Sequence, residues 1–328
     1  MNQKSEIIDV INSGNTFVIL GHVNPDGDSL GSMLGLSLYL REQAHKIVYV
    51  PAPIEWPTRY IYLEKHRNGD SNPPIDKVDA IIILDCSATN RADWGNLNPA
   101  EMKDVPQIVI DHHDEGAYFG DYNWIDTKSA AVGEMIFELL TDLGAEITPQ
   151  IAEALYSAIM TDTGRFTFSC TTARSLAICS ELVSRGGIKP SLITANIYSS
   201  FSEEYLRNIG IALYNSRIYN DSRIVLLTLD KASVRSFSTT FNDTEGIVDL
   251  AMSVRGVELA ALFKEISRNV IRISLRSRGR IDVGAIAVEL GGGGHHNAAG
   301  CTLTMPLSLS REVILDKFET ALDNVDNV

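Results

Sequence analysis

Three short apolar segments, each followed at once by polar residues, limit most strongly how the first half of this chain can fold. They are TFVIL (16–20), AIIILD (80–85) and QIVID (107–111). Apolar runs of this length are typical of strands that are buried on both faces of a parallel sheet. The stretches 29–42 and 130–143 are helix-like. This order predicts an α/β domain in which helices flank both faces of a parallel sheet.

Four polar clusters lie where an apolar segment meets a loop. They are His22, Asp26 and Asp28 in HVNPDGD; Asp85 in IIILD; Asp111, His112 and His113 in DHH; and Asp162 in TDTGRF. Ligands of open parallel sheets bind beyond the carboxyl ends of the strands. We therefore expect the four clusters to meet in one crevice.

The predicted crevice would hold many carboxylates, and carboxylates that share a site repel one another. Two divalent cations would neutralise this charge. Mixed imidazole and carboxylate ligands suit Mn²⁺, with Mg²⁺, Co²⁺ and Zn²⁺ left open. Two metal ions about 4 Å apart are the usual arrangement for phosphoester hydrolysis. The pattern thus predicts a two-metal site.

Each cluster taken alone has a simpler explanation. Asp28 or Ser29 could merely cap the following helix, because both residue types are favoured there. The DHH tripeptide could be a partly buried histidine pair. The joint occurrence of all four clusters, in this order and each at the end of an apolar segment, favours the metal site.

A break in the second half divides the chain. SRGGIKPS (184–191) contains glycine and proline, and RIVLLTLD, from about residue 222, begins a new strand-like series. We predict a catalytic domain over 1–190, a helical connector over 191–221 and a smaller α/β domain over 222–328. The active site is expected in the cleft between the two domains.

The segment NVIRISLRSRGR (269–280) alternates apolar and basic residues, as a strand with two different faces does. The inward positions are Ile271, Ile273 and Leu275, and the opposite positions are Arg272, Ser274, Arg276, Arg278 and Arg280. Arginine matches phosphate geometry with two hydrogen bonds, so the basic face is a candidate phosphate clamp. The alternative is a solvated strand face, and Arg278 and Arg280 could belong to a turn.

Four glycines follow a predicted helix over 282–290, for which Asp282 is the expected N-cap. Gly291 could end the helix in a left-handed conformation. The remaining three, with the histidine after them, suggest a backbone that approaches an anion; they are Gly292, Gly293, Gly294 and His295. A flexible loop is the alternative. Arg91 and Arg165 could stabilise phosphoryl charge or balance nearby carboxylates.

The composition disfavours long duplex DNA and membranes as binding partners. The net charge of −14 disfavours a clamp for long duplex DNA. No apolar run is long enough to span a bilayer, and the N-terminus does not resemble a secretory signal. The cysteines form no CxxC pair, which fits a reducing cytoplasm; they are Cys86, Cys170, Cys179 and Cys301. A homodimer is left open.

The four clusters together resemble the signature motifs of the DHH phosphoesterase superfamily, and GGGGHHNAAG (291–300) resembles the glycine-rich motif of its associated C-terminal domain. The chain is most similar to the nano-RNase and 3′-phosphoadenosine-5′-phosphate (pAp) phosphatase group, the bifunctional oligoribonucleases. The resemblance implies one metal ion held by His22, Asp26 and Asp85. It implies a second ion held by Asp28, Asp85, His112 and Asp162, with Asp85 as the bridge.

The resemblance also implies roles for neighbouring residues. Asp111 would orient an imidazole, and His113 would contact the scissile phosphate or protonate the leaving oxygen. Arg276 and Ser277 match the basic substrate-binding position. The implied activity is metal-dependent hydrolysis of short oligoribonucleotides and of pAp.

Three other functions share some of these features. Cyclic di-AMP and its linear product pApA are alternative substrates, and a row of arginines would also suit polyphosphate. The non-enzymatic alternative is a nucleotide-binding regulator without turnover. The intact set of ligands argues against it.

Overall fold

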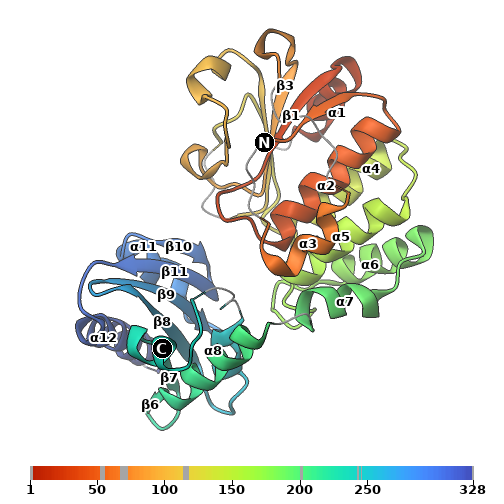
Figure 1. Ribbon diagram of the computed structural model, residues 1–328. Coiled ribbons are helices and arrows are strands. Elements are labelled where there is room, and N and C mark those ends of the chain that lie inside the picture. Colours follow the sequence, from red (N-terminus) through yellow and green to blue (C-terminus); the bar gives the residue numbers. More distant parts are fainter. Residues whose placement is uncertain are drawn as a thin grey trace. The chain divides into compact units, whose positions relative to one another are not determined.

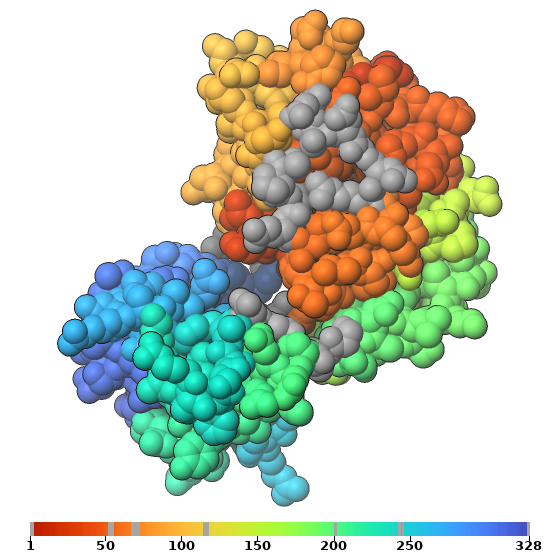
Figure 2. Space-filling view, in the orientation of Figure 1, coloured from red at the N-terminus to blue at the C-terminus, as the bar shows by residue number. Residues whose placement is uncertain are grey.

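The computed structural model describes residues 3–51, 56–66, 73–113, 118–199, 202–241, 244 and 246–326. The chain forms two compact units, Met1–Ser200 and Phe201–Val328, which Figure 1 shows as ribbons and Figure 2 as surfaces coloured by residue number. Among the helices of the described residues, none combines the length and the apolar character that crossing a membrane requires.

The first unit contains the elements expected of an α/β domain. Its helices are α1 (Lys4–Ser13), α2 (Gly27–Glu42), α3 (Ile61–Glu64), α4 (Val132–Asp142), α5 (Pro149–Asp162), α6 (Ala173–Gly186) and α7 (Pro190–Tyr198). Its strands are β1 (Thr16–Leu20), β2 (Ile47–Tyr49), β3 (Ala80–Leu84), β4 (Gln107–Asp111) and β5 (Tyr122–Ile125). Short 3₁₀ helices lie at Thr58–Tyr60, Ile75–Lys77, Thr89–Arg91 and Pro99–Met102.

The strands of the first unit form one parallel sheet in the order β2-β1-β3-β4-β5. The predicted parallel sheet flanked by helices is therefore confirmed. Three of its strands coincide with the apolar segments that begin at residues 16, 80 and 107.

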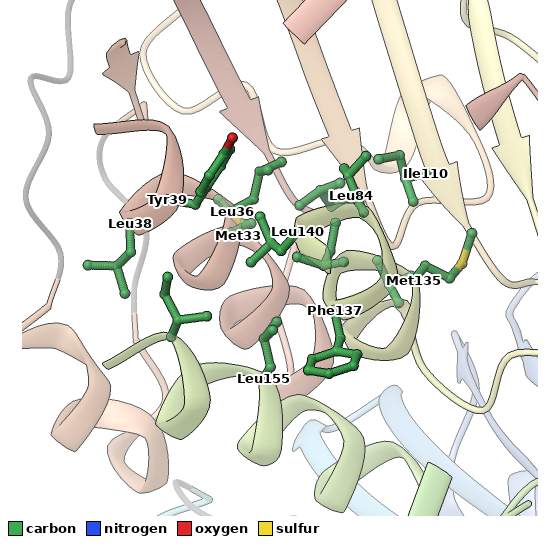
Figure 3. Packing of buried hydrophobic residues seen from close by; sticks show 14 of the residues in the cluster. Met33, Leu36, Leu38, Tyr39, Leu84, Ile110, Met135, Phe137, Leu140 and Leu155 are labelled. Atoms are coloured by element: carbon green, nitrogen blue, oxygen red, sulfur yellow. The ribbon is translucent and has the colours of Figure 1, made fainter. Parts of the chain in front are cut away.

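Alternate residues of these strands pack into different cores, as the two faces of a pleated sheet require. Phe17 and Ile19 belong to the large core that also contains side chains from α1, α2, α4 and α5, part of which is drawn in Figure 3. Val18 and Leu20 face a smaller core. The segments between residues 86 and 105 that cover this second face contain short 3₁₀ helices rather than α-helices.

Helices α2 and α5 pack closely because α2 has a glycine at every fourth position, at Gly27, Gly31 and Gly35. A Cβ atom at Gly31 would collide with the carbonyl oxygen of Ala154 in α5, and one at Gly27 would collide with the side chain of Thr161. The close packing brings the first turn of α2 beside the last turn of α5.

The second unit is a smaller α/β domain with a mixed sheet. Its helices are α8 (Glu203–Tyr214), α9 (Lys231–Ser236), α10 (Ile247–Met252), α11 (Val283–Glu289) and α12 (Leu307–Asp326). Its strands are β6 (Arg217–Tyr219), β7 (Ile224–Leu229), β8 (Leu259–Ser267), β9 (Val270–Ser277), β10 (Gly293–His295) and β11 (Ala298–Leu303). The strand order is β10-β11-β9-β8-β7-β6, and among the described strands of this unit only β7 and β8 pair in parallel.

One face of this sheet packs against α11 and α12, and the other face of β7 and β8 packs against α8, α9 and α10. Strand β9 has the predicted alternation, since Ile271, Ile273 and Leu275 are buried. Arg272 on its opposite face is exposed, and Arg276 is partly exposed.

The predicted connector 191–221 is shared between the two units. Helix α7 contributes Ile193 and Ile197 to the core of the first unit, whereas α8 contributes Tyr205 and Ile211 to a core of the second. The division falls between residues 200 and 201.

Candidate metal centre

The carboxyl ends of β1, β3 and β4 meet at one edge of the first sheet. Leu20 pairs with Ile83, and Leu84 pairs with Ile110, so the residues that follow these strands emerge side by side. Asp85 has a left-handed backbone (φ 55°), which aspartate adopts more readily than most residues. Such backbone strain is concentrated at functional sites.

The loop after β1 directs its two aspartates to different partners. Asp26 is the N-cap of α2, because its Oδ1 accepts hydrogen bonds from the backbone N–H groups of Asp28 and Ser29 at 3.0 and 3.1 Å. The alternative in which Asp28 or Ser29 caps this helix is therefore wrong. Asp28 is buried, and it accepts hydrogen bonds from the N–H groups of Val132 and Gly133, at the start of α4, at 2.6 and 2.9 Å.

His22 and His112 turn the same ring nitrogen toward these carboxylates. Nδ1 of His22 lies 2.9 Å from the carbonyl oxygen of Val23, and Nδ1 of His112 lies 3.0 Å from that of Ser129. A carbonyl oxygen can only accept, so each Nδ1 carries a proton and donates it. Histidines that bind metals through Nε2 are oriented by this kind of hydrogen bond.

Asp85 lies between the two histidines. Its Oδ2 is 3.4 Å from Nε2 of His22, and its Oδ1 is 3.7 Å from Nε2 of His112. Asp26 completes the group around His22, where Oδ1 is 3.8 Å from Nε2. Asp162, the last residue of α5, places Oδ2 3.4 Å from Nε2 of His112.

Two sets of donor atoms are thus gathered tightly enough to surround an ion. The first consists of His22, Asp26 and Asp85, and the second of Asp28, His112 and Asp162. Within each set, one donor atom from every residue lies within 4.8 Å of the others. The structure therefore brings together all six side chains that the sequence predicted as metal ligands.

The electrostatics show that the cluster requires positive charge. Burial and the negative charge of Asp85 raise the pKa of Asp28 to about 7. Burial and the charge of Asp28 also raise the pKa of Asp162. Burial alone would lower the pKa of each histidine, but nearby aspartates reverse this effect and raise the pKa of His22 to about 11 and that of His112 to about 10.

The donor set fits divalent metal ions. In the part of the chain that the structure describes, the ion pairs formed by Asp28, Asp85 and Asp162 are all with histidine rings. The raised pKa values of His22 and His112 reflect this excess of negative charge, which a divalent ion would neutralise in place of the protons. Imidazole nitrogens and carboxylate oxygens together suit ions such as Mn²⁺, Co²⁺ and Zn²⁺.

Asp111 and His113 form a pair at the edge of this cluster. Nδ1 of His113 donates a hydrogen bond to Oδ1 of the fully buried Asp111 at 2.7 Å. Burial opposes ionisation of Asp111, but the hydrogen bond and charge of His113 outweigh it and lower the pKa of the carboxyl. Nδ1 of His113 also lies 3.8 Å from Oδ1 of Asp85. The imidazole that Asp111 orients is therefore that of His113.

Comparisons with known proteins identify the family to which the chain is similar. The model of the DHH family, N-terminal domain, matches residues 16–159, and that of the DHHA1 domain matches residues 224–328. The chain is 30% identical over 292 residues to the bifunctional oligoribonuclease and PAP phosphatase NrnA of Thermus thermophilus, covering 87% of this chain and 83% of that protein.

The chain belongs to the DHH family. It is also 27% identical to the bifunctional oligoribonuclease and PAP phosphatase NrnA of Bacillus subtilis, over 92% of this chain and 93% of that protein. The crystal structure of an exopolyphosphatase-related protein from Bacteroides fragilis superimposes with a TM-score of 0.85 at 30% identity, and the match covers 98% of this chain and 96% of that one.

Two further arginines of the first unit, Arg91 and Arg165, were predicted to stabilise phosphoryl charge or to balance nearby carboxylates. The backbone of Arg91 lies beside the metal-site loop, since its carbonyl oxygen accepts a hydrogen bond from the N–H of Val23 at 2.8 Å. The guanidinium of Arg165 lies over the ring of Tyr198, 4.8 Å from its centroid. Contact of either side chain with a substrate stays a prediction.

In the DHHA1 domain, three predicted substrate-binding residues share one face of the sheet. Arg276 pairs in register with Ala298, and Ala298 pairs with His295. The side chains of Arg276 and His295 therefore lie on the same face of the sheet, on either side of Ala298. Gly293 lies two residues before His295 on the same strand. Arg276 is also tied to α10, because its Nε donates to Oδ1 of Asp249 at 2.7 Å.

The other predicted residues of this domain, Ser277, Gly292 and Gly294, have roles in the fold of the domain itself. Ser277 faces the opposite side of β9, where its hydroxyl donates to the carbonyl oxygen of Ile281 at 2.6 Å. A Cβ atom at Gly292 would collide with the carbonyl oxygen of Gly300, and Gly294 has φ of 145°. Gly293 differs, since a Cβ atom there would meet nothing within 4 Å.

Sequence reasoning missed the groups that hold the ligands in place. The carbonyl of Ser129 and the N–H groups at the start of α4 are main-chain atoms, which residue patterns do not reveal. Asp249, the partner of Arg276, lies in a short helix without any recognisable motif. The preference of aspartate for helix N-termini could have pointed to Asp26 as the cap.

Proposed function

We propose that this protein is a metal-dependent phosphoesterase that hydrolyses short oligoribonucleotides and pAp. The observation that carries the proposal is the position of Asp85, whose two oxygens face two separate sets of imidazole and carboxylate donors. The relatives from Thermus thermophilus and Bacillus subtilis, both named as oligoribonuclease and PAP phosphatase, supply the substrate class.

We assign His22, Asp26 and Asp85 to one ion and Asp28, Asp85, His112 and Asp162 to the other, with Mn²⁺ favoured over Mg²⁺ or Co²⁺. Bound divalent ions would activate water and stabilise the charge that develops on the phosphoryl oxygens. The chain itself fixes both Nε2 atoms through hydrogen bonds from Nδ1, so the ligands need little rearrangement.

His113 would act on the substrate directly. Its Nδ1 proton is donated to Asp111, and Nε2 would contact the phosphate or protonate the leaving oxygen. The buried Asp111 holds the ring of His113 in one orientation through this hydrogen bond.

The DHHA1 domain would bind a phosphate of the substrate through Arg276 and His295, with Gly293 permitting close approach. A cytoplasmic location is part of the proposal, because the cysteines form no CxxC pair. Long duplex nucleic acid and membranes are not expected as partners.

The test is a comparison of kcat/KM for pAp, pApA, RNA of two to five nucleotides, cyclic di-AMP and polyphosphate, measured with Mn²⁺. We expect the short RNAs and pAp to give the highest values. A preference for polyphosphate would instead support the second candidate, exopolyphosphatase activity, which the solved relative from Bacteroides fragilis favours by its description. Tight nucleotide binding without turnover on any substrate would overturn the enzymatic proposal.

A further inference from the structure

One segment of the first unit supplies main-chain groups to two of the proposed metal ligands. The carbonyl oxygen of Ser129 accepts the hydrogen bond from Nδ1 of His112 at 3.0 Å. Three residues later, the N–H groups of Val132 and Gly133 bind the two oxygens of Asp28. The position of this segment, residues 126–134, therefore sets the direction of both side chains.

Arg174, the second residue of α6, holds this segment. Its Nη1 donates to Oγ of Ser129 at 3.0 Å and to Oδ2 of Asp126 at 3.3 Å. Oγ of Ser129 donates in turn to the same Asp126 oxygen at 2.8 Å. The three side chains form a closed triangle around the turn that presents the Ser129 carbonyl.

The other end of the segment is held by the same guanidinium. Glu134, in the first turn of α4, is fully buried, and its Oε2 lies 3.6 Å from Nη1 of Arg174. Its Oε2 also accepts a hydrogen bond from the N–H of Ala130 at 3.4 Å. Nη2 of Arg174 binds Oε1 of Glu138, one turn further along α4, at 2.6 Å. A buried carboxylate that loses a cationic partner is strongly unfavourable.

We propose that Arg174 is a positioning residue that fixes segment 126–134 and so aims His112 and Asp28 at the second metal ion. Arg174 acts through Ser129 and α4. The main-chain hydrogen bonds of this segment described above go to His112 and Asp28, which are assigned to the second ion. Loss of Arg174 should therefore weaken one metal ion selectively. The inference depends on the proposed metal site.

The test titrates Mn²⁺ alone into the full-length protein by calorimetry and follows the bound ions by electron paramagnetic resonance. The wild type is expected to bind two ions whose spins are coupled. Arg174→Lys keeps the charge beside Glu134 but loses the planar fork that reaches Ser129 and Asp126 together. We expect it to unfold near the wild-type temperature and to bind the second ion about 10- to 100-fold more weakly, the range typical of groups that orient metal ligands.

Two further variants test the same proposal, one at Ser129 and one as a control on α6. Ser129→Ala removes one corner of the triangle but keeps the carbonyl, so we expect a smaller loss at the same ion. Arg185→Gln is the matched control, because Arg185 lies on the same helix and pairs with Glu181 at 3.3 Å; both ions should bind as in the wild type.

The outcomes separate the two proposals. If the wild type does not bind a pair of Mn²⁺ ions, the proposed metal site fails. If the wild type binds two ions and Arg174→Lys binds both with unchanged affinity, the role of Arg174 is overturned while the metal site stands. An equal loss of both ions in Arg174→Lys also overturns it, because the effect would then not be confined to His112 and Asp28.

Discussion

At the scale of single residues, Asp85 carries the greatest weight, because each of its oxygens faces a different histidine. Asp85→Asn keeps the shape but removes the charge shared by both donor sets. We expect kcat to fall by at least about 1,000-fold on every substrate, the scale on which preorganised electrostatic groups act. Steady-state kinetics with Mn²⁺ checks this. Asp93→Asn, a nearby aspartate that accepts a hydrogen bond from Gly95, should retain activity, and a similar loss in both variants would contradict the prediction.

The raised pKa values of His22 and His112 lead to a second prediction, which concerns the protons released when metal binds. Their pKa values of about 11 and about 10 mean that both rings are protonated at neutral pH without metal, whereas a ligand nitrogen must be unprotonated. Metal binding should therefore release protons from His22 and His112, and further protons from Asp28 and Asp162, whose pKa values are also raised. Affinity should rise with pH across the neutral range. Calorimetry in buffers of different ionisation enthalpy measures this release, and a heat independent of the buffer would refute it.

At the scale of elements, the sequence predicted the strand ends well because buried parallel strands are local apolar runs. Such runs precede the loop that begins at His22, and they also precede Asp85 and the DHH residues. The convergence of these residues could therefore be predicted. The contribution of α4 could not, because Val132 and Gly133 reach Asp28 from more than a hundred residues away. Likewise, no local pattern indicates that Arg174 faces the turn at Ser129.

The close packing of α2 on α5 predicts that Gly31→Ala lowers both stability and metal affinity. Gly31→Ala would press a methyl group against the carbonyl oxygen of Ala154, and overpacking of this kind costs about 1–3 kcal/mol. It should also separate Asp28 from Asp162 and weaken Mn²⁺ binding. Denaturant unfolding and metal titration measure the two effects. Gly210→Ala in α8 is the control, since a Cβ atom there meets nothing within 4 Å and alanine favours a helix by about 1 kcal/mol. Equal stability changes in both variants would count against the packing argument.

At the scale of the whole molecule, the proposed substrates are polyanions, whereas the chain itself is acidic, with a net charge of −14. The metal cluster and the basic face of β9 lie in different units, so chemistry and substrate binding should be separable by mutation. Arg276→Gln removes a charged donor from the DHHA1 domain and leaves the metal ligands untouched. We expect KM for pAp and short RNA to rise about 10- to 100-fold, since a hydrogen bond to a charged group contributes about 1.5–3 kcal/mol.

In the same variant, kcat and the number of bound Mn²⁺ ions should stay close to those of the wild type. Arg217→Gln serves as the matched control, because Arg217 is exposed on the edge strand β6 and its guanidinium binds the carbonyl oxygen of Ser216 at 3.0 Å. If Arg276→Gln lowered kcat and left KM unchanged, Arg276 would take part in the chemical step rather than in substrate binding. The assignment of the two tasks to the two units would then have to be abandoned.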